Sequence, residues 1–530
     1  MPDPQTERRD SGEGCAAKAE GAFIGLAAGD ALGWPQEFPS RVVHRAATPG
    51  LPSTAFRQWT RKSGGRYYAH EEVIKPGEYS DDTQLLLAVA RSRLFPGANW
   101  WTALTRTELP LWTLYERGGG GATKRAVDLW VKGVQPWKAG DAKAVRQYFD
   151  AGGNGVAMRV LPHAVAHAKS EDAAALMRDV MLDGVATHGH PRALVGATSY
   201  AYAAWWLLRA HHTVAFGELL GVMLAGETIW GGLPAVAHPK AGWMDAANQW
   251  ARDGYAAVWS SVVGEMVSLL KTAQQGIEAG ALAEDDAILK QLGCFGRAKG
   301  AGTVSAAAAA YLCSRYAAQP VQAVLTAAFA HGSDTDTIAA MTGGLAGCLS
   351  GREWLPAEWL RVQDVEYLRR LAVDLARGPH GDEPGEERPQ PVGARDLDGI
   401  RARLSAGPPG DIPLGGTRSA SVTDFVALRP ISKTTVAQCW HIRTSDGQTL
   451  YVTKLGRLPK GGASASSPEH DPAARRQPEA TEAGARAHAA GVKLTVTDLN
   501  ASANFYGNLL GLFAVKRTPR FVSFGAISLV

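Results

Sequence analysis

The chain has 530 residues, 45% of them hydrophobic, and a formal net charge of +4 at pH 7. This length accommodates one large domain with a smaller companion, or two or three domains. The small net charge excludes any general electrostatic argument for binding nucleic acid or a membrane surface.

The first twenty residues are polar and charged, without the apolar core of a signal peptide. No segment approaches ~20 uninterrupted apolar residues, so the sequence predicts no transmembrane helix. The five cysteines are scattered, odd in number and lack CxxC spacing, which argues against a disulfide framework or a zinc site. We therefore expect a cytoplasmic protein that does not associate with membranes.

Residues 1–15 are expected to form a disordered tail, and residues 16–377 to form one compact all-α domain. The longer segment is rich in Ala, Leu and Gly, its apolar spacing is helical, and it contains no convincing strand. Helices are predicted at residues 16–33, 83–94, 157–168, 173–184, 193–210, 255–273, 304–316, 321–330 and 338–351.

The chain changes character after this domain. Residues 378–425 are predicted to be a linker, because Pro, Gly and charged residues dominate there. Residues 426–458 are predicted to be a small β-hairpin segment, with strands at 435–442 and 449–455 around an Asp-Gly turn. Residues 459–489 have few apolar side chains and are predicted to be a disordered linker.

The final segment, residues 490–530, has the pattern of a small α+β unit. Its expected elements are a strand at 492–498, a helix at 501–510 and strands at 513–516 and 521–530. It resembles the opening unit of the vicinal-oxygen-chelate (glyoxalase and bleomycin-resistance) fold through Thr497-Asp498-Leu499, Phe505-Tyr506 and Leu509-Leu510-Gly511-Leu512. That fold normally pairs two such units, and Gly491 stands where many members have a metal-binding histidine. We therefore expect an appendage or a truncated remnant.

Two acidic clusters, Ser80-Asp81-Asp82-Thr83 and Asp334-Thr335-Asp336-Thr337, lie at the heads of predicted helices. Each combines carboxylates with hydroxyls, the oxygen ligands that hard divalent cations prefer, and neighbouring carboxylates can bridge two ions. A single cluster of this kind is also typical of an ordinary helix N-cap. Two such clusters suggest a dinuclear Mg²⁺ or Mn²⁺ centre.

Two further motifs are rich in glycine: residues 25–33, followed by Glu37, and residues 152–159. Helix packing explains the first set of glycines, and an ordinary turn explains the second as well as an anion-binding loop does. Asp30 and Arg159 are more informative, because a charged side chain in apolar surroundings needs a partner. A pair between these two residues is plausible.

In this order and spacing, the four motifs resemble the signature of the ADP-ribosylglycohydrolase family across residues 16–377. The resemblance implies an all-α fold, two Mg²⁺ (or Mn²⁺) ions in a cleft, and removal of ADP-ribose from modified side chains or related conjugates. The chain departs from the family where Gly332-Ser333 replaces a common Gly-Gly, and where Ser80 replaces a common threonine and keeps the hydroxyl.

The resemblance also implies roles for individual residues. The metal ligands would be Ser80, Asp81, Asp82, Asp334, Asp336 and Thr337, with Asp336 a candidate bridge. The catalytic residues would be Glu37, Asp81 and Asp336. The substrate-binding residues would be Gly153, Asn154 and Gly155, His188 in a Thr-His-Gly segment, and Gly119 in the glycine-rich segment 117–123. A helix-terminal hydrogen bond explains His188 equally well, as a flexible turn explains 117–123.

The implied reaction is hydrolysis of the glycosidic bond at C1″ of ADP-ribose, with Glu37 or an aspartate ligand acting as general base or positioning the water. The substrate would be an ADP-ribosylated protein or nucleic-acid acceptor.

The sequence leaves open which acceptor this is, the choice between Mg²⁺ and Mn²⁺, and the oligomeric state. The alternatives are a non-catalytic ADP-ribose-binding or structural member of the family, and a protein whose functional part is the C-terminal unit. Catalysis is favoured because both acidic clusters and Glu37 are present.

Overall fold

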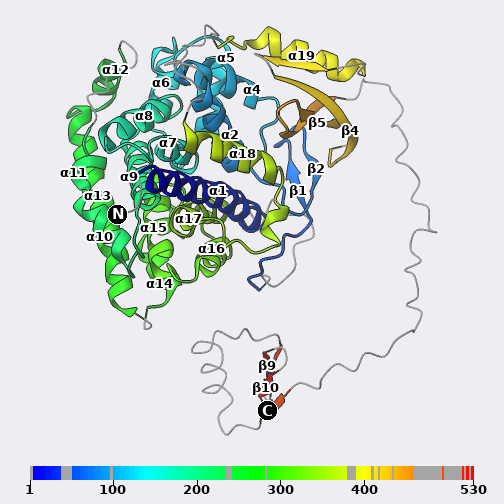
Figure 1. Cartoon of the computed structure of the whole chain (residues 1–530). Helices are drawn as coiled ribbons and strands as arrows, with labels where there is room; N and C mark the ends of the chain where they lie inside the picture. Colours follow the sequence, from blue (N-terminus) through cyan, green and yellow to red (C-terminus); the bar gives the residue numbers. More distant parts are fainter. Residues whose placement is uncertain are drawn as a thin grey trace, which may run out of the picture. The chain divides into compact units, whose positions relative to one another are not determined.

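The computed structural model of the chain describes residues 4–37, 51–95, 100–233, 242–280, 283–378, 389–407, 411–415, 418–432, 435–457, 492–494, 516–518, 521–524 and 527–529. These residues belong to two compact units, Met1–Lys460 and Gly461–Val530. The first unit is mostly helical and carries a β-sheet built from residues 59–74 and 412–457 (Figure 1).

The helices of the described residues follow one another closely along the first unit. They are α1 (Pro4–Glu37), α2 (Asp81–Leu94), α3 (Trp100–Ala103), η3 (Leu104–Glu108), α4 (Leu109–Trp112), α5 (Gly121–Val131), η4 (Pro136–Lys138), α6 (Ala142–Phe149), η5 (Ala157–Arg159), α7 (Leu161–Ala166), α8 (Ala173–Val185), α9 (Pro191–Arg209), α10 (Glu218–Ala225), α11 (Glu227–Trp230), α12 (Trp243–Trp250), α13 (Tyr255–Glu278), α14 (Asp285–Gln291), α15 (Gly302–Arg315), α16 (Pro320–Ala328), α17 (Thr335–Ser350), η7 (Trp359–Arg361), α18 (Val365–Arg377) and α19 (Ala394–Ala406). The prediction of an all-α domain with a small β-containing C-terminal region is confirmed.

The strands lie in two separate sheets. They are β1 (Trp59–Ser63), β2 (His70–Ile74), β3 (Ile412–Gly415), β4 (Arg418–Pro430), β5 (Thr435–Thr444), β6 (Thr449–Arg457), β7 (Val492–Leu494), β8 (Lys516–Thr518), β9 (Phe521–Phe524) and β10 (Ile527–Leu529). In the first unit the strand order is β1-β2-β4-β5-β6, with β3 paired to β4. In the second unit the order is β7-β10-β9-β8. The predicted helix at 501–510 and Gly491 lie outside the described residues, and the vicinal-oxygen-chelate resemblance is not shown.

The centre of the helical unit contains helices that are buried on all sides. Every residue of α15 from Gly302 to Ser314 is buried, as is every residue of α17 from Thr335 to Cys348. Both helices are rich in small residues, which allow neighbouring helices to approach from several directions. Among the helices that the structure describes, none is both long enough and apolar enough to cross a membrane.

Helices α1 and α17 run antiparallel and touch through their backbones (Figure 1). Four glycines of α1, spaced four residues apart, form the contact face: Gly21, Gly25, Gly29 and Gly33. A Cβ atom built on Gly29 would lie 2.2 Å from the carbonyl oxygen of Ala339, and one built on Gly33 would lie 2.3 Å from that of Thr335. Only glycine permits this approach. The C-terminal end of α1 therefore meets the N-terminal end of α17.

The structure differs from the sequence-based expectation near the N-terminus. Helix α1 begins at Pro4, inside the segment 1–15 that was expected to be a disordered tail. Strands β1 and β2 lie in a region where no strand was expected. Their buried positions include Arg61 and Glu72, which face each other and form an ion pair of 2.7 Å. These strands therefore lack the alternation of apolar and polar residues by which a strand is predicted from sequence.

The segment 378–425, expected to be a linker, contains α19, β3 and part of β4. Helix α19 contains five charged residues among its 13, but it buries Leu397, Ile400 and Leu404. Strand β4 pairs with β2 through Glu71↔Arg429 and with β5 through Ala427↔Gln438. The β5–β6 hairpin is therefore part of the first compact unit.

The close contact of α1 and α17 can be tested with two Gly→Ala substitutions. A Cβ on Gly343 of α17 would lie 2.1 Å from the carbonyl oxygen of Gly25. We expect Gly343→Ala to lower the free energy of unfolding by about 1–3 kcal/mol, because the helices must move apart. In Gly264→Ala, on an exposed face of α13 with open space around the glycine, the same change is expected to stabilise the chain by about 0.5–1 kcal/mol. Chemical denaturation of both variants measures the difference, and equal effects would contradict the packing described.

Candidate metal and substrate site

Two helix ends, the C-terminus of α1 and the N-terminus of α17, meet at one group of acidic side chains. Glu37 is the last residue of α1, Asp334 is the N-cap of α17, and Asp336 lies in the first turn of α17. One carboxylate oxygen from each of these three residues lies within 4.8 Å of the others. The antiparallel contact of α1 and α17 places the three acids together, although Glu37 is about 300 residues from the others in sequence.

The first acidic cluster, at the N-terminus of α2, joins this group. The Ser80 hydroxyl is the N-cap and accepts a hydrogen bond of 3.4 Å from the backbone N–H of Asp82. The Asp82 carboxylate lies close enough to Asp334 for their charges to interact, and a hydrogen bond from the Thr337 side chain favours its charged form. The structure therefore brings together the two clusters that the sequence places about 250 residues apart.

Asp30 of α1 anchors the first turn of α2. Its fully buried carboxylate accepts hydrogen bonds from the backbone N–H of Ser80 at 3.0 Å and of Thr83 at 3.0 Å, and from the Thr83 hydroxyl at 2.7 Å. The expected pair between Asp30 and Arg159 was wrong. Arg159 pairs instead with Asp183, at 2.7 Å, and both side chains are fully buried. Asp30 and Arg159 therefore both have a partner, as expected. The partner of Arg159 is Asp183, and the partners of Asp30 are Ser80 and Thr83 at the start of α2.

The group carries more negative charge than the described protein atoms compensate. Burial, together with Asp30, Asp81 and Asp334, raises the pKa of Asp82 well above its usual value. Burial and the neighbouring acids do the same to the pKa of Asp336. The Asp82 Oδ1 atom is buried without a hydrogen-bond partner among the described residues. Because buried carboxylate oxygens are normally satisfied, this arrangement fits a bound cation.

The second glycine-rich motif reaches the acidic group through Asn154. Its side-chain amide donates to Asp334 Oδ2 at 2.9 Å and to Ser305 Oγ at 3.0 Å. Gly153 forms a bridge with Ala301, and the Asn154 backbone N–H donates to the Gly300 carbonyl at 2.9 Å. The loop 153–155 is therefore fixed against the start of α15, and Asn154 orients one of the predicted metal ligands.

His188 lies beside the same loop. Thr187 Oγ1 accepts a hydrogen bond from Arg159 at 2.9 Å and forms a hydrogen bond of 2.8 Å with His188 Nδ1. Burial and the charge of Arg159 lower the pKa of His188 to about 3, so the ring stays neutral at physiological pH. A Cβ built on Gly155 would lie 3.1 Å from His188 Cε1.

The glycine-rich segment 117–123 also approaches the acids, but through a different glycine from the one expected. Gly118 has φ +111°, and a Cβ built on it would lie 2.8 Å from Asp81 Oδ1. A Cβ on Gly119, the predicted residue, would instead lie 2.5 Å from the Trp112 ring. A run of four glycines contains no signal that distinguishes its members. The contact of Asn154 with Asp334 was likewise not readable from the sequence.

The chain is similar in sequence to several known proteins. The ADP-ribosylglycohydrolase family model matches residues 12–385. The ADP-ribosyl-[dinitrogen reductase] glycohydrolase of Rhodospirillum rubrum is 32% identical over 178 residues, covering 33% of this chain and 52% of that protein. The ADP-ribosylarginine hydrolase Tri1 of Serratia proteamaculans is 29% identical over 147 residues, covering 24% of this chain and 35% of that protein. The chain thus spans about half, or less, of the length of these relatives.

A solved structure described as an ADP-ribosylglycohydrolase-related protein complex is also similar, with a TM-score of 0.41 and 22% sequence identity. The alignment covers 69% of this chain and 99% of that chain.

The charge of the acidic group predicts how stability depends on pH in protein freed of divalent cations. Burial, Glu116 and Asp30 raise the pKa of Asp81 to about 8. The folded chain then retains a proton that the unfolded chain releases above pH ~4, so the free energy of unfolding falls between about pH 4 and pH 8. We expect Asp81→Asn to raise the Tm at pH 8 and to leave it unchanged at pH 4.

The matched control is Asp398→Asn, whose carboxylate is exposed on α19 and which should follow the wild type at both pH values. Differential scanning calorimetry measures both variants. An equal change in Tm for Asp81→Asn at pH 4 and pH 8 would contradict the electrostatic account.

Proposed function

The chain belongs to the ADP-ribosylglycohydrolase family, and from this premise we propose that it is a metal-dependent hydrolase of ADP-ribose conjugates. The bond cleaved would be the glycosidic bond between C1″ of ADP-ribose and the acceptor. The observation that carries the proposal is the acidic group, in which one carboxylate oxygen each of Glu37, Asp334 and Asp336 lies within 4.8 Å of the others and the buried Asp82 Oδ1 has no hydrogen-bond partner among the described residues.

Two divalent cations, Mg²⁺ or Mn²⁺, fit the chemistry of this group, because its donors are all oxygen atoms. The proposed ligands are Ser80, Asp81, Asp82, Asp334, Asp336 and Thr337. When bound, the cations would supply the positive charge that neutralises these acids, holds the ribose hydroxyls and lowers the pKa of a water.

The residues around the acids would perform the remaining tasks. Glu37, at the end of α1, lies beside Asp334 and Asp336 and is proposed to orient the attacking water and to accept its proton. Asn154 keeps Asp334 in one orientation through its hydrogen bond of 2.9 Å. The carboxylates near the anomeric carbon would stabilise the positive charge that develops there as the glycosidic bond breaks.

The loop 153–155 and His188 are proposed to bind the ADP-ribose. His188, whose Nδ1 forms a hydrogen bond of 2.8 Å with Thr187 Oγ1, is proposed to offer Nε2 to a substrate atom. The low pKa of His188, about 3, keeps the ring neutral through the physiological range. The lack of a side chain at Gly118 allows the glycine-rich loop to lie close to Asp81, because a Cβ there would lie 2.8 Å from Asp81 Oδ1.

The acceptor is proposed to be a protein. The names of the two relatives describe action on dinitrogen reductase and on ADP-ribosylarginine, so an ADP-ribosylated arginine is the first conjugate to test. An ADP-ribosylated nucleic-acid base belongs in the same panel. A non-catalytic ADP-ribose-binding role is the alternative, and it would give calorimetric binding of ADP-ribose with Mg²⁺ but no turnover on any conjugate.

The proposal predicts that Asp336→Asn lowers kcat/KM by at least about 100-fold while the fold is kept. The substitution changes one buried carboxylate to an amide of the same size, so the helical circular dichroism spectrum should not change. The assay measures release of ADP-ribose from an ADP-ribosylarginine peptide with Mg²⁺ or Mn²⁺, and with EDTA. Asp245→Asn, on the exposed face of α12, is the control and should retain wild-type activity. Full activity in Asp336→Asn would remove the metal-dependent mechanism.

A further inference from the structure

We infer that the β5–β6 hairpin, which lies beyond the family-matched residues 12–385, positions the acidic turn at the start of α2 and the neighbouring glycine loop. The hairpin thereby becomes part of the support of the metal site. The inference rests on the proposed function, because it concerns the geometry of that same site. Two independent chains of contacts lead from the hairpin to the site.

The first chain begins at Tyr451 on β6. Its hydroxyl donates to Glu78 Oε1 at 2.7 Å, and Glu78 Oε2 accepts from Arg117 at 2.9 Å. The Arg117 guanidinium lies over the Tyr451 ring, 4.1 Å from its centroid. All three side chains are buried. One hairpin residue therefore contacts both Glu78, two residues before the N-cap Ser80, and Arg117, directly before Gly118.

Arg117 is also tied to the sheet. Its Nε donates to Glu72 Oε1 at 2.9 Å on β2, and the other oxygen of Glu72 pairs with Arg61 at 2.7 Å. Burial alone would raise the pKa of Glu72, but the charges of Arg117 and Arg61 outweigh it and bring the pKa to about 2. The glycine loop thus starts from a charged arginine whose Nε and Nη2 atoms are paired, while its Nη1 atom is buried without a hydrogen-bond partner among the described residues. The close approach of Gly118 to Asp81 therefore depends on the position of Arg117.

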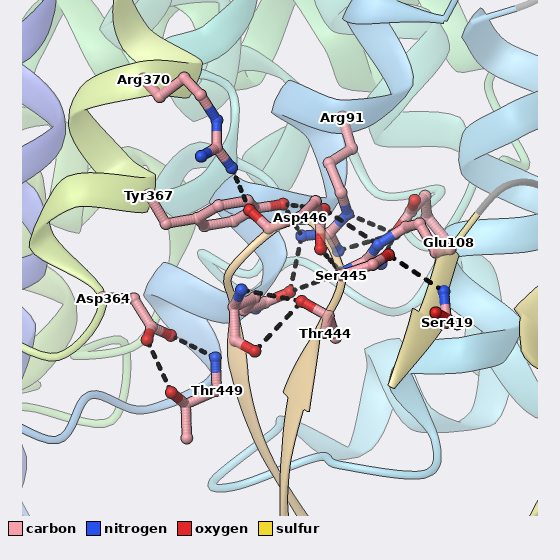
Figure 2. Close-up of polar contacts among 12 residues, drawn as sticks. Arg91, Glu108, Asp364, Tyr367, Arg370, Ser419, Thr444, Ser445, Asp446 and Thr449 are labelled. Carbon is pink, nitrogen blue, oxygen red and sulfur yellow. Dashed lines mark hydrogen bonds and ion pairs between the residues drawn. The ribbon is translucent and has the colours of Figure 1, made fainter. Parts of the chain in front are cut away.

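The second chain passes through Asp364, directly before α18 (Figure 2). The Asp364 carboxylate accepts two hydrogen bonds of 2.8 Å from Thr449 on β6, one from the backbone N–H and one from the hydroxyl. It also accepts a bond of 2.9 Å from the hydroxyl of Tyr79, the residue before Ser80. Asp364 has φ +58°, a conformation that non-glycine residues seldom adopt and that the surrounding contacts must hold.

The turn of the hairpin is bound by side chains of α18 (Figure 2). Asp446 accepts a hydrogen bond of 2.7 Å from the Tyr367 hydroxyl of α18, and its carbonyl accepts one from Arg370. Gln448 accepts a bond of 2.8 Å from Arg91 of α2, and Arg91 is paired with Glu108 at 2.7 Å. The turn of the hairpin is therefore held by α18 and α2, and the adjacent residues Thr449 and Tyr451 contact Asp364 and Glu78, which lead to the acidic turn. These contacts fix the hairpin relative to the start of α2.

The experiment compares two Tyr→Phe variants of the full chain. Tyr451→Phe removes the hydroxyl that binds Glu78 and keeps the ring over Arg117. Tyr311→Phe is the matched control, because Tyr311 of α15 is also buried and also donates to a carboxylate, Asp285, at 2.9 Å. Three quantities are measured: the Tm, the Kd for Mn²⁺ alone by electron paramagnetic resonance titration, and backbone amide exchange of residues 78–83 in cation-free protein.

We expect both variants to lose a similar amount of Tm. Only Tyr451→Phe should raise the Mn²⁺ Kd, by about 10-fold, and speed the exchange of the Ser80 and Thr83 amides, which donate to Asp30. Tyr79→Phe, which removes the hydroxyl bound to Asp364, should act in the same direction.

An unchanged Mn²⁺ Kd and unchanged exchange in Tyr451→Phe, with a wild type that binds Mn²⁺, would overturn this inference and leave the proposed function intact. A wild type that binds no Mn²⁺ would overturn both.

Discussion

The site depends on the direct backbone contact between α1 and α17. Four glycines on one face of α1 let the two helices approach until carbonyl oxygens occupy the space of missing Cβ atoms. Because the helices are antiparallel, this contact fixes the end of α1 against the start of α17. Glu37 and Asp30 are carried by one helix, and Asp334 and Asp336 are carried by the other. A larger residue in the contact would separate the acids as well as the helices.

The acidic group that would bind cations also destabilises the folded chain. The acids are buried close together, which raises the pKa values of Asp81, Asp82 and Asp336 and disfavours their charged forms. The N-termini of α2 and α17 point toward them and offset part of the repulsion. Asp30 adds three hydrogen bonds from the first turn of α2. The remaining negative charge is what a pair of divalent cations would neutralise, so cation binding and folding are expected to be coupled.

Much of this arrangement was predictable from local sequence patterns. The two acidic clusters stand at helix starts, as their hydroxyl and carboxylate content indicated, and the apolar spacing predicted most of the long helices. The partners of charged residues were not predictable. A buried Asp30 and a buried Arg159 each require a partner, but the sequence does not say which, and the expected pairing between them was wrong. The choice between Gly118 and Gly119 also depends on φ, which a run of glycines does not reveal.

The sheet was the least predictable part, for a related reason. Strands β1 and β2 bury an Arg61–Glu72 pair where a half-buried strand normally presents apolar residues. Local patterning placed strands at the sites of β5 and β6 but could not say that β4 would pair with β2 and bring the hairpin against α2 and α18. Long-range pairing of this kind is decided by tertiary contacts such as those of Tyr451 and Asp364.

The most direct measurement is a crystal structure of the protein grown with Mn²⁺, with anomalous difference maps collected at the manganese edge. The account predicts two peaks about 3.5–4 Å apart, enclosed by Asp81 and Asp82 on one side and by Asp334 and Asp336 on the other. Maps without a peak among these four carboxylates, in crystals soaked at millimolar Mn²⁺, would contradict it.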